Sequence, residues 1–176
     1  RLRHGGSDGC APRGADGDRW RLQTGLRRDS RLVTARVMGA NGDRAMTFRA
    51  VTHGFEVSAE PTYCRERSQP EDNRHFWTYT ITIRNGGGEP AQLVARHWDI
   101  VDERGQRQVV DGPGVVGEQP VLAPGESFRY TSGVPLTTPS GMMRGHYRMR
   151  GSGGREFDIA IPAFSLDSPN MNRRAN

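Results

Sequence analysis

The segment Gly112-Pro113-Gly114-Val115-Val116-Gly117 fits the pattern GxGxxG. In dinucleotide-binding folds such glycines let backbone N–H groups approach a pyrophosphate at the start of a helix. Here the next residues, Glu118-Gln119-Pro120, do not open a helix in that way, and no β-α-β unit surrounds the motif. We therefore expect a structural loop in which Gly112, Gly114 and Gly117 provide positive φ or close packing. Binding of a nucleotide or pyrophosphate, with hydrolysis as its extension, is the alternative.

A second group with chemical potential is the run Arg96-His97-Trp98-Asp99. In a β-strand, His97 and Asp99 point to one face of the sheet, and Arg96 and Trp98 point to the other. His97 and Asp99 could supply two ligands to a divalent metal, but two ligands are too few for a specific site. No histidine or carboxylate cluster with metal-ligand spacing supplements them. We therefore predict a hydrogen-bonded, surface or half-buried histidine and no cofactor.

The candidate nucleophiles are isolated in the sequence. Ser132, Ser140 and Ser165 occur in turn-like segments, where a hydroxyl commonly bonds its own backbone. Cys64 has no assignable general base nearby. Because catalysis needs a nucleophile with a base, or paired acids in a pocket, we predict that the chain is not an enzyme.

Two blocks mix polar, glycine and apolar residues most closely, at 130–133 and 138–143. On a β-sandwich the loops gather at the two ends, where binding surfaces are usually built. One interpretation is a partner surface that uses Met as an adaptable contact. The other is that Tyr130 and Met143 complete the core while the glycines complete turns. The candidate binding residues in these blocks are Tyr130, Ser132, Gly133, Ser140, Gly141 and Met143.

The elements that must position these residues are strands, because apolar side chains recur with period two from Met46 onward. The clearest strand is 75–85, with Trp77, Tyr79, Ile81 and Ile83 on one face. A strand at 51–58 is expected to end at the Glu60-Pro61 break, and 111–124 is expected to be a connection. The remaining strands are predicted at 92–102, 107–110, 126–132, 142–150 and 156–161. Seven or eight short antiparallel strands predict an all-β sandwich of immunoglobulin or fibronectin type III kind.

The net charge of +5 on 176 residues comes from the N-terminal part of the chain. Residues 1–45 hold ten Arg against five Asp, and the rest is neutral. We predict an Arg/Gly-rich, disordered extension over 1–46, a domain over 47–167 and a flexible tail over 168–176. Met46 lies where the pattern changes, so the extension is expected to precede a domain that begins there. A neutral domain gives no charge-based reason to expect nucleic acid binding.

The expected compartment follows from two features. Cys10 and Cys64 are the only cysteines, and we expect them to form neither a disulfide framework nor a zinc site, which indicates a reducing environment. No apolar run is long enough to span a bilayer, and the first residues lack the apolar stretch of a secretory signal. These features predict a cytoplasmic protein without membrane partners.

Several blocks, in this order, resemble the bacterial ApaG family: EPTYCRERSQPE, FWTYTITIRNGG, QLVARHWDI, GPGVVGEQPVLAPGESFRYTSGVPLTTPSGMMRGHYRM and FDIAIPAFSLD. The resemblance covers residues 47–167. It implies a fibronectin type III-like fold and a link to cobalt resistance and magnesium efflux. Related eukaryotic domains, in an F-box protein and in a polymerase-interacting protein, imply partner binding. We therefore expect a non-enzymatic protein-interaction or regulatory module in divalent-cation homeostasis, with an unknown protein partner. A weak homodimer is compatible with this expectation.

Overall fold

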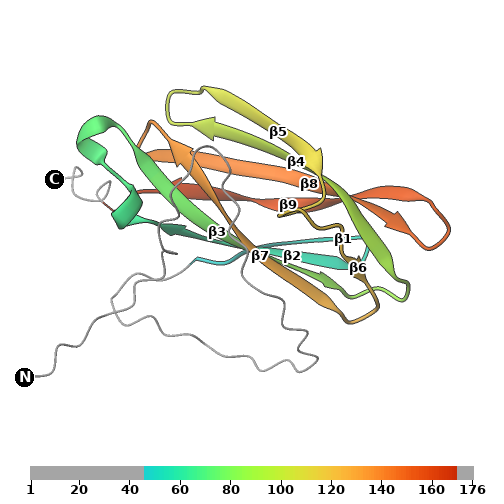
Figure 1. Ribbon diagram of the computed structural model, residues 1–176. Coiled ribbons are helices and arrows are strands. Elements are labelled where there is room, and N and C mark those ends of the chain that lie inside the picture. Colours follow the sequence, from blue (N-terminus) through green and yellow to red (C-terminus); the bar gives the residue numbers. More distant parts are fainter. Residues whose placement is uncertain (1–45, 170–176) are drawn as a thin grey trace, which may run out of the picture.

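The computed structural model describes residues 46–169, which form two antiparallel β-sheets packed face to face (Figure 1). One sheet has the order β1-β2-β3-β7, and the other has the order β5-β4-β8-β9 with β6 paired to β4. The strands are β1 (Phe48–Thr52), β2 (Phe55–Tyr63), β3 (His75–Asn85), β4 (Ala91–Asp102), β5 (Arg107–Pro113), β6 (Val121–Leu122), β7 (Ser127–Leu136), β8 (Ser140–Gly151) and β9 (Glu156–Asp167). Two 3-10 turns, η1 (Arg65–Arg67) and η2 (Pro70–Asp72), lie between β2 and β3.

The predicted β-sandwich is confirmed, with nine strands within residues 46–169 in place of seven or eight. Of the predicted N-terminal extension over 1–46 and the predicted tail over 168–176, only Met46, Ser168 and Pro169 are among the described residues.

The core lies between the sheets, and β3 shows how the sequence forms it. Trp77, Tyr79, Ile81 and Ile83 are buried, as their alternation with threonines and Arg84 predicts. Opposite them, the Trp98 ring of β4 lies 5.3 Å from the Tyr79 ring. Burial of each such side chain contributes on the order of 1.5–3 kcal/mol, so this interlocking of aromatic rings fixes how the two sheets stack.

Several predicted strand boundaries are wrong: β5, β7 and β9 extend to Pro113, Leu136 and Asp167, and two further differences concern β1 and β2. Residues 51–58 are not one strand, because β1 and β2 form a hairpin whose turn residues His53 and Gly54 have φ of 50° and 79°. Pro61 does not end β2. The β1–β2 pairing ends at Ala59, so β2 has no β1 neighbour at Pro61. Proline is tolerated there because no hydrogen bond from its backbone nitrogen to β1 is required.

The segment 111–124 is also more ordered than a simple connection. Its first residues extend β5 to Pro113, and its later part contributes β6, which pairs with the start of β4.

The two long sides of the sandwich differ. On one side β9 contacts β1 and β2, so the sheets close on each other. On the other side the sheets end in the edge strands β7 and β5. We call this second side the open side and define it by the edge strands β5 and β7 together with Arg96 and Gly112.

One prediction about the cysteines is wrong, because Cys64 is buried and disulfide-bonded. Within residues 46–169, none of the helices has the length and apolar character needed to cross a lipid bilayer.

Candidate functional site

The GxGxxG segment is a tight turn whose backbone bonds are made inside the protein. The Gly114 N–H donates to the Val94 carbonyl at 2.9 Å, and Val115 and Glu118 exchange two N–H···O bonds of 2.8 Å each. Between them Val116 and Gly117 have φ of 45° and 82°, as in a two-residue hairpin turn. The N–H groups of Gly114 and Val115 in the segment, and of Glu118 directly after it, are therefore already used, which favours the structural loop over a phosphate cradle.

Gly112 is needed because Arg96 lies flat against it. The two residues pair across β4 and β5, and a Cβ on Gly112 would lie 3.0–3.1 Å from the Arg96 guanidinium atoms. From there the Arg96 Nη1 donates to the carbonyls of Pro113 at 3.0 Å and Gly114 at 2.8 Å. Because Gly112 has no side chain, Arg96 can extend across the edge strand β5 to the open side.

Beneath Arg96 the two sheets are joined by phenol hydroxyls. Tyr147 pairs with Arg96 across β8 and β4, and its hydroxyl lies 2.5 Å from that of Tyr130 on β7. Burial raises the pKa of both phenols. Burial also raises the pKa of Tyr79, while the Ser132 hydroxyl and the Arg96 charge oppose that rise. Tyr130 is therefore part of the core, and Ser132 joins β7 to Tyr79.

His97 is on the outer face of the sheet, as predicted. Its Nδ1 lies 2.6 Å from an oxygen of Asp111, and its ring stacks on His146 with centroids 4.8 Å apart. Within residues 46–169, no group of three or more His, Cys, Asp or Glu side chains is placed to hold a metal ion.

Asp99 lies on the same face, and both of its carboxylate oxygens accept hydrogen bonds from arginines. Arg107 Nε donates to one of its oxygens at 2.6 Å, and Arg144 Nε donates to the other at 3.0 Å. The Arg107 hydrogen bond is the main cause that lowers the pKa of Asp99, and Arg144 adds to the effect. A hollow of about 350 Å³ between His97 and Ile161 is thus lined by groups that are already paired.

The other predicted binding residues do not come together in one place. Trp98, Tyr130 and Met143 are buried in the core. A Cβ on Gly133 would lie 2.4 Å from the Phe76 ring, and one on Gly141 would lie 2.6 Å from Leu136, so both glycines serve packing. Ser140 Oγ donates to the Asp167 carboxylate at 3.0 Å. These positions match the interpretation in which the blocks complete the core and the turns.

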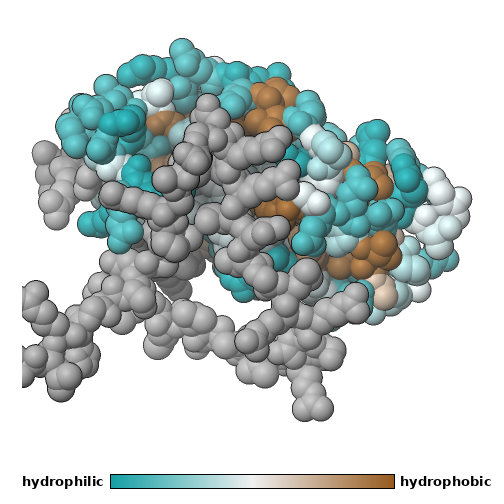
Figure 2. Space-filling view, viewed as in Figure 1, coloured by the Kyte–Doolittle hydropathy of each residue, from teal (hydrophilic) through white to brown (hydrophobic). Residues whose placement is uncertain are grey.

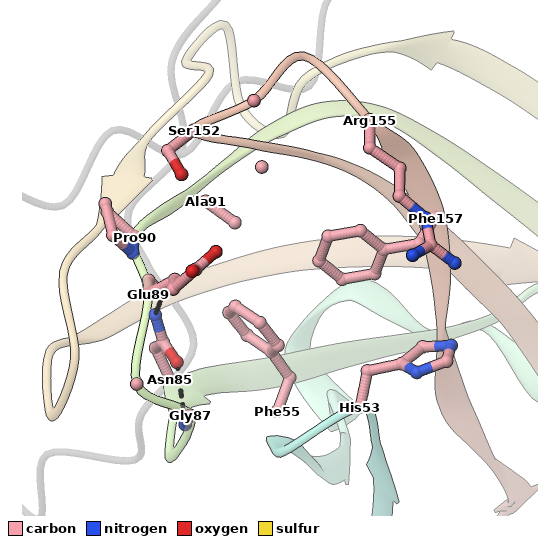
Figure 3. A pocket seen from close by; sticks show the side chains of 13 residues that line it. His53, Phe55, Asn85, Gly87, Glu89, Pro90, Ala91, Ser152, Arg155 and Phe157 are labelled. Carbon is pink, nitrogen blue, oxygen red and sulfur yellow. Dashed lines mark hydrogen bonds between the residues drawn. The ribbon is translucent and has the colours of Figure 1, made fainter.

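A site that the sequence did not indicate lies at one end of the sandwich. There the β1–β2, β3–β4 and β8–β9 turns surround a hollow of about 390 Å³ (Figure 3). We call it the end hollow. Its main lining residues are Phe55, Glu89, Pro90, Ser152, Arg155 and Phe157.

The end hollow combines an aromatic wall with charged groups on its rim. The rings of Phe55 and Phe157 have centroids 5.9 Å apart, and His53 meets Phe157 edge-on at 5.5 Å. Figure 3 shows the Glu89 side chain pointing into the hollow. Glu89 and Arg155 are both exposed, and neither belongs to an ion pair within the described part of the chain. The hollow can therefore accept an apolar group and charges of both signs.

One buried amide holds the rim of the end hollow in place. Asn85 Nδ2 donates to the carbonyls of Glu89 and Leu122 at 2.8 and 2.9 Å, and its Oδ1 accepts the Gly87 N–H at 2.9 Å. These three bonds fix the β3–β4 turn and hence the backbone that carries Glu89. The sequence signals this site only through the Gly-rich segments after Asn85 and Gly151, which by themselves indicate turns.

Two antiparallel sheets with an aromatic core between them place this chain in the class of β-sandwich domains. Residues 65–151 match the model of the ApaG domain. Protein ApaG of Brucella anthropi is 56% identical over 129 residues, which cover 73% of this chain and 99% of that protein. Protein ApaG of Bradyrhizobium sp. strain ORS 278 is 57% identical over 129 residues, which also cover 73% of this chain and 99% of that protein. The crystal structure of a Bordetella pertussis protein described as ApaA is similar with a TM-score of 0.65 and 47% identity, covering 66% of this chain and 95% of that one. The chain belongs to the ApaG family.

Proposed function

We propose that this chain is a non-enzymatic protein-interaction module and that its end hollow receives a segment of a partner protein. One observation carries this proposal: turns from both sheets surround a preformed hollow with a phenyl wall and two charged side chains that lack an ion-pair partner in residues 46–169. A mainly apolar lining with a few polar or charged groups that fix orientation is the usual composition of a binding pocket.

The chemistry of the end hollow defines the partner segment. An apolar side chain packs against the Phe55 and Phe157 rings, a neighbouring basic residue pairs with Glu89, and an acidic residue pairs with Arg155. Charge complementarity of this kind sets the orientation of the segment more than its affinity.

The rest of the surface favours a local anchor over a broad apolar interface. Within residues 46–169 the exposed large apolar side chains are Met46, Val51, Val109, Val121 and Met142. On the face in Figure 2 the hydrophobic areas are separated by hydrophilic surface. Separate apolar residues are normal on a soluble surface and do not define an interface by themselves.

The family's link to cobalt resistance and magnesium efflux would then be indirect. We propose that the module acts in the cytoplasm through its partner and does not hold the ion. The arrangement of His97 and Asp99 supports this, because both are already bonded to side chains of this chain, namely Asp111, Arg107 and Arg144.

The test is capture of a partner by the full chain and by two tryptophan variants. Gly153→Trp should fill the end hollow without strain, because Gly153 has no positive φ and nothing lies within 4 Å of its added Cβ. Gln106→Trp places the same side chain on the turn after Asp102, at an exposed position outside the hollow. We expect a protein that binds the wild type directly, after purification, to be lost with Gly153→Trp and kept with Gln106→Trp. Equal binding by both variants would contradict the proposal.

A further inference from the structure

The Arg96 guanidinium on the open side has one occupied edge and one free edge. Its Nη1 is bonded to the Pro113 and Gly114 carbonyls, whereas Nε and Nη2 make no hydrogen bond within residues 46–169. No carboxylate of the described residues pairs with Arg96. Every buried side-chain N or O atom in that part of the chain has a partner, so the free Nε and Nη2 must reach solvent.

This geometry suits a carboxylate. A guanidinium presents two parallel N–H groups along an edge, and a carboxylate accepts both at once. Because two backbone carbonyls and the Gly112 backbone already hold Arg96 in place, little further side-chain entropy is lost when the second edge is used.

The same side of the sandwich offers an unpaired strand edge. β7 is the last strand of its sheet and pairs only with β3 among the described strands, so alternate N–H and C=O groups of β7 face outward. Arg96 lies close to the strands at this side of the sandwich, since its cross-strand neighbour Tyr147 bonds Tyr130 of β7 and its charge acts on the Tyr130 phenol.

We propose that the open side binds an extended acidic segment of a protein partner, which pairs with the free edge of β7 and places a carboxylate on Nε and Nη2 of Arg96. The strand edge supplies sequence-independent backbone hydrogen bonds, and Arg96 supplies the selection for an acidic residue. This site is separate from the end hollow, and neither proposal depends on the other.

The experiment is a magnetic-resonance titration of the full chain with short synthetic peptides. One peptide alternates Glu with Thr, its counterpart has Gln in place of each Glu, and acetate is the free carboxylate. We expect the Glu peptide to shift both the Arg96 Nε–H resonance and the outward-facing β7 amides. The Gln peptide should bind at least about tenfold more weakly, because it lacks the charge-assisted bidentate pair.

Three variants control for charge and for folding. Arg96→Gln should abolish the preference for Glu, and Arg84→Gln should keep it, because Arg84 is an exposed arginine on the outer face of β3 with no ion pair among the described residues. Gly112→Ala keeps every charge but displaces the guanidinium, so it should also weaken the Glu peptide. This variant decides the matter if Arg96→Gln fails to fold.

Four results would overturn the proposal. The first is that no resonance shifts, and the second is that the Glu and Gln peptides bind equally. The third is that acetate shifts the Arg96 resonance while no peptide shifts the β7 amides. The fourth is that the β7 amide shifts depend on the concentration of the chain without peptide. The last would place a second copy on this edge. None of them bears on Gly153→Trp, so the two proposals can fail separately.

Discussion

The Gly112–Gly117 loop and the end hollow are both built from glycine-rich turns, but they use their backbones in opposite ways. In the loop, Gly114, Val115 and Glu118 donate their N–H groups to carbonyls of the same domain. At the end hollow, the turns after Asn85 and Gly151 stand apart and leave about 390 Å³ between them. Of these two regions, the end hollow alone combines open volume with charged side chains, Glu89 and Arg155, that have no ion-pair partner among residues 46–169.

The largest expected difference between the two regions is in stability. Gly114→Ala would place a Cβ 2.1 Å from the Glu118 carbonyl oxygen at a φ of +56°, so we expect a loss of about 2–4 kcal/mol in the free energy of unfolding. Gly153→Ala meets nothing within 4 Å and should change stability by no more than about 1 kcal/mol, in the stabilising direction. Chemical denaturation of both variants checks this. Similar losses would remove the distinction between the loop and the hollow.

The buried hydroxyls of Tyr130 and Tyr147 should contribute to stability as a coupled pair. Tyr130→Phe or Tyr147→Phe leaves the other buried hydroxyl without its partner, so each should cost about 1–3 kcal/mol. The double variant should cost clearly less than the sum, because no unpaired hydroxyl then remains. A double-mutant cycle by denaturation measures this. Additive costs would show that the 2.5 Å contact does not couple the two sheets.

A smaller effect on the free energy of unfolding is expected from Asp99 and should depend on pH. The pKa of Asp99 is lowered in the folded state, mainly by Arg107, so its contribution is complete above the unfolded pKa and is lost as the pH falls through the folded pKa. Asp99→Asn should therefore be less stable than the wild type at neutral pH, and the gap should close in acid. Melting temperatures across that range test this. A gap independent of pH would contradict the assigned ion pairs.

The smallest expected effect distinguishes the charges of the two regions. Glu89→Gln should change stability by less than about 0.5 kcal/mol, since Glu89 is in no ion pair among residues 46–169, and should weaken partner binding by up to about fivefold. Glu118→Gln, directly after the loop, should leave binding unchanged. If the loop variant weakened binding more than the hollow variant, the assignment of the site would be reversed.

Much of the fold could be predicted because a buried sheet face imposes alternation on the sequence. The boundaries of β3 were predicted to the residue, since its apolar face and the glycines that follow it are both unambiguous. The β1–β2 hairpin was missed because the alternation of Val51, His53, Phe55 and Val57 continues across the turn. His53 also takes up a positive φ, which a non-glycine residue seldom does.

The candidate site could not be predicted in the same way. Residues 53–54, 86–90 and 151–157 are distant in the chain and meet only because the two sheets stack in one orientation. The side chains that the sequence marked by type, such as Trp98 and Met143, are in the core. Their residue types are compatible with core or surface, and only the stacking of the sheets decides between them.

The most direct test of the account is a hydrogen-exchange footprint of the full chain bound to its captured partner. If the end hollow is the anchor, the partner should slow exchange at residues 86–90 and 151–157 while exchange at 112–117 stays unchanged. Protection confined to 112–117, with none around the end hollow, would contradict the account.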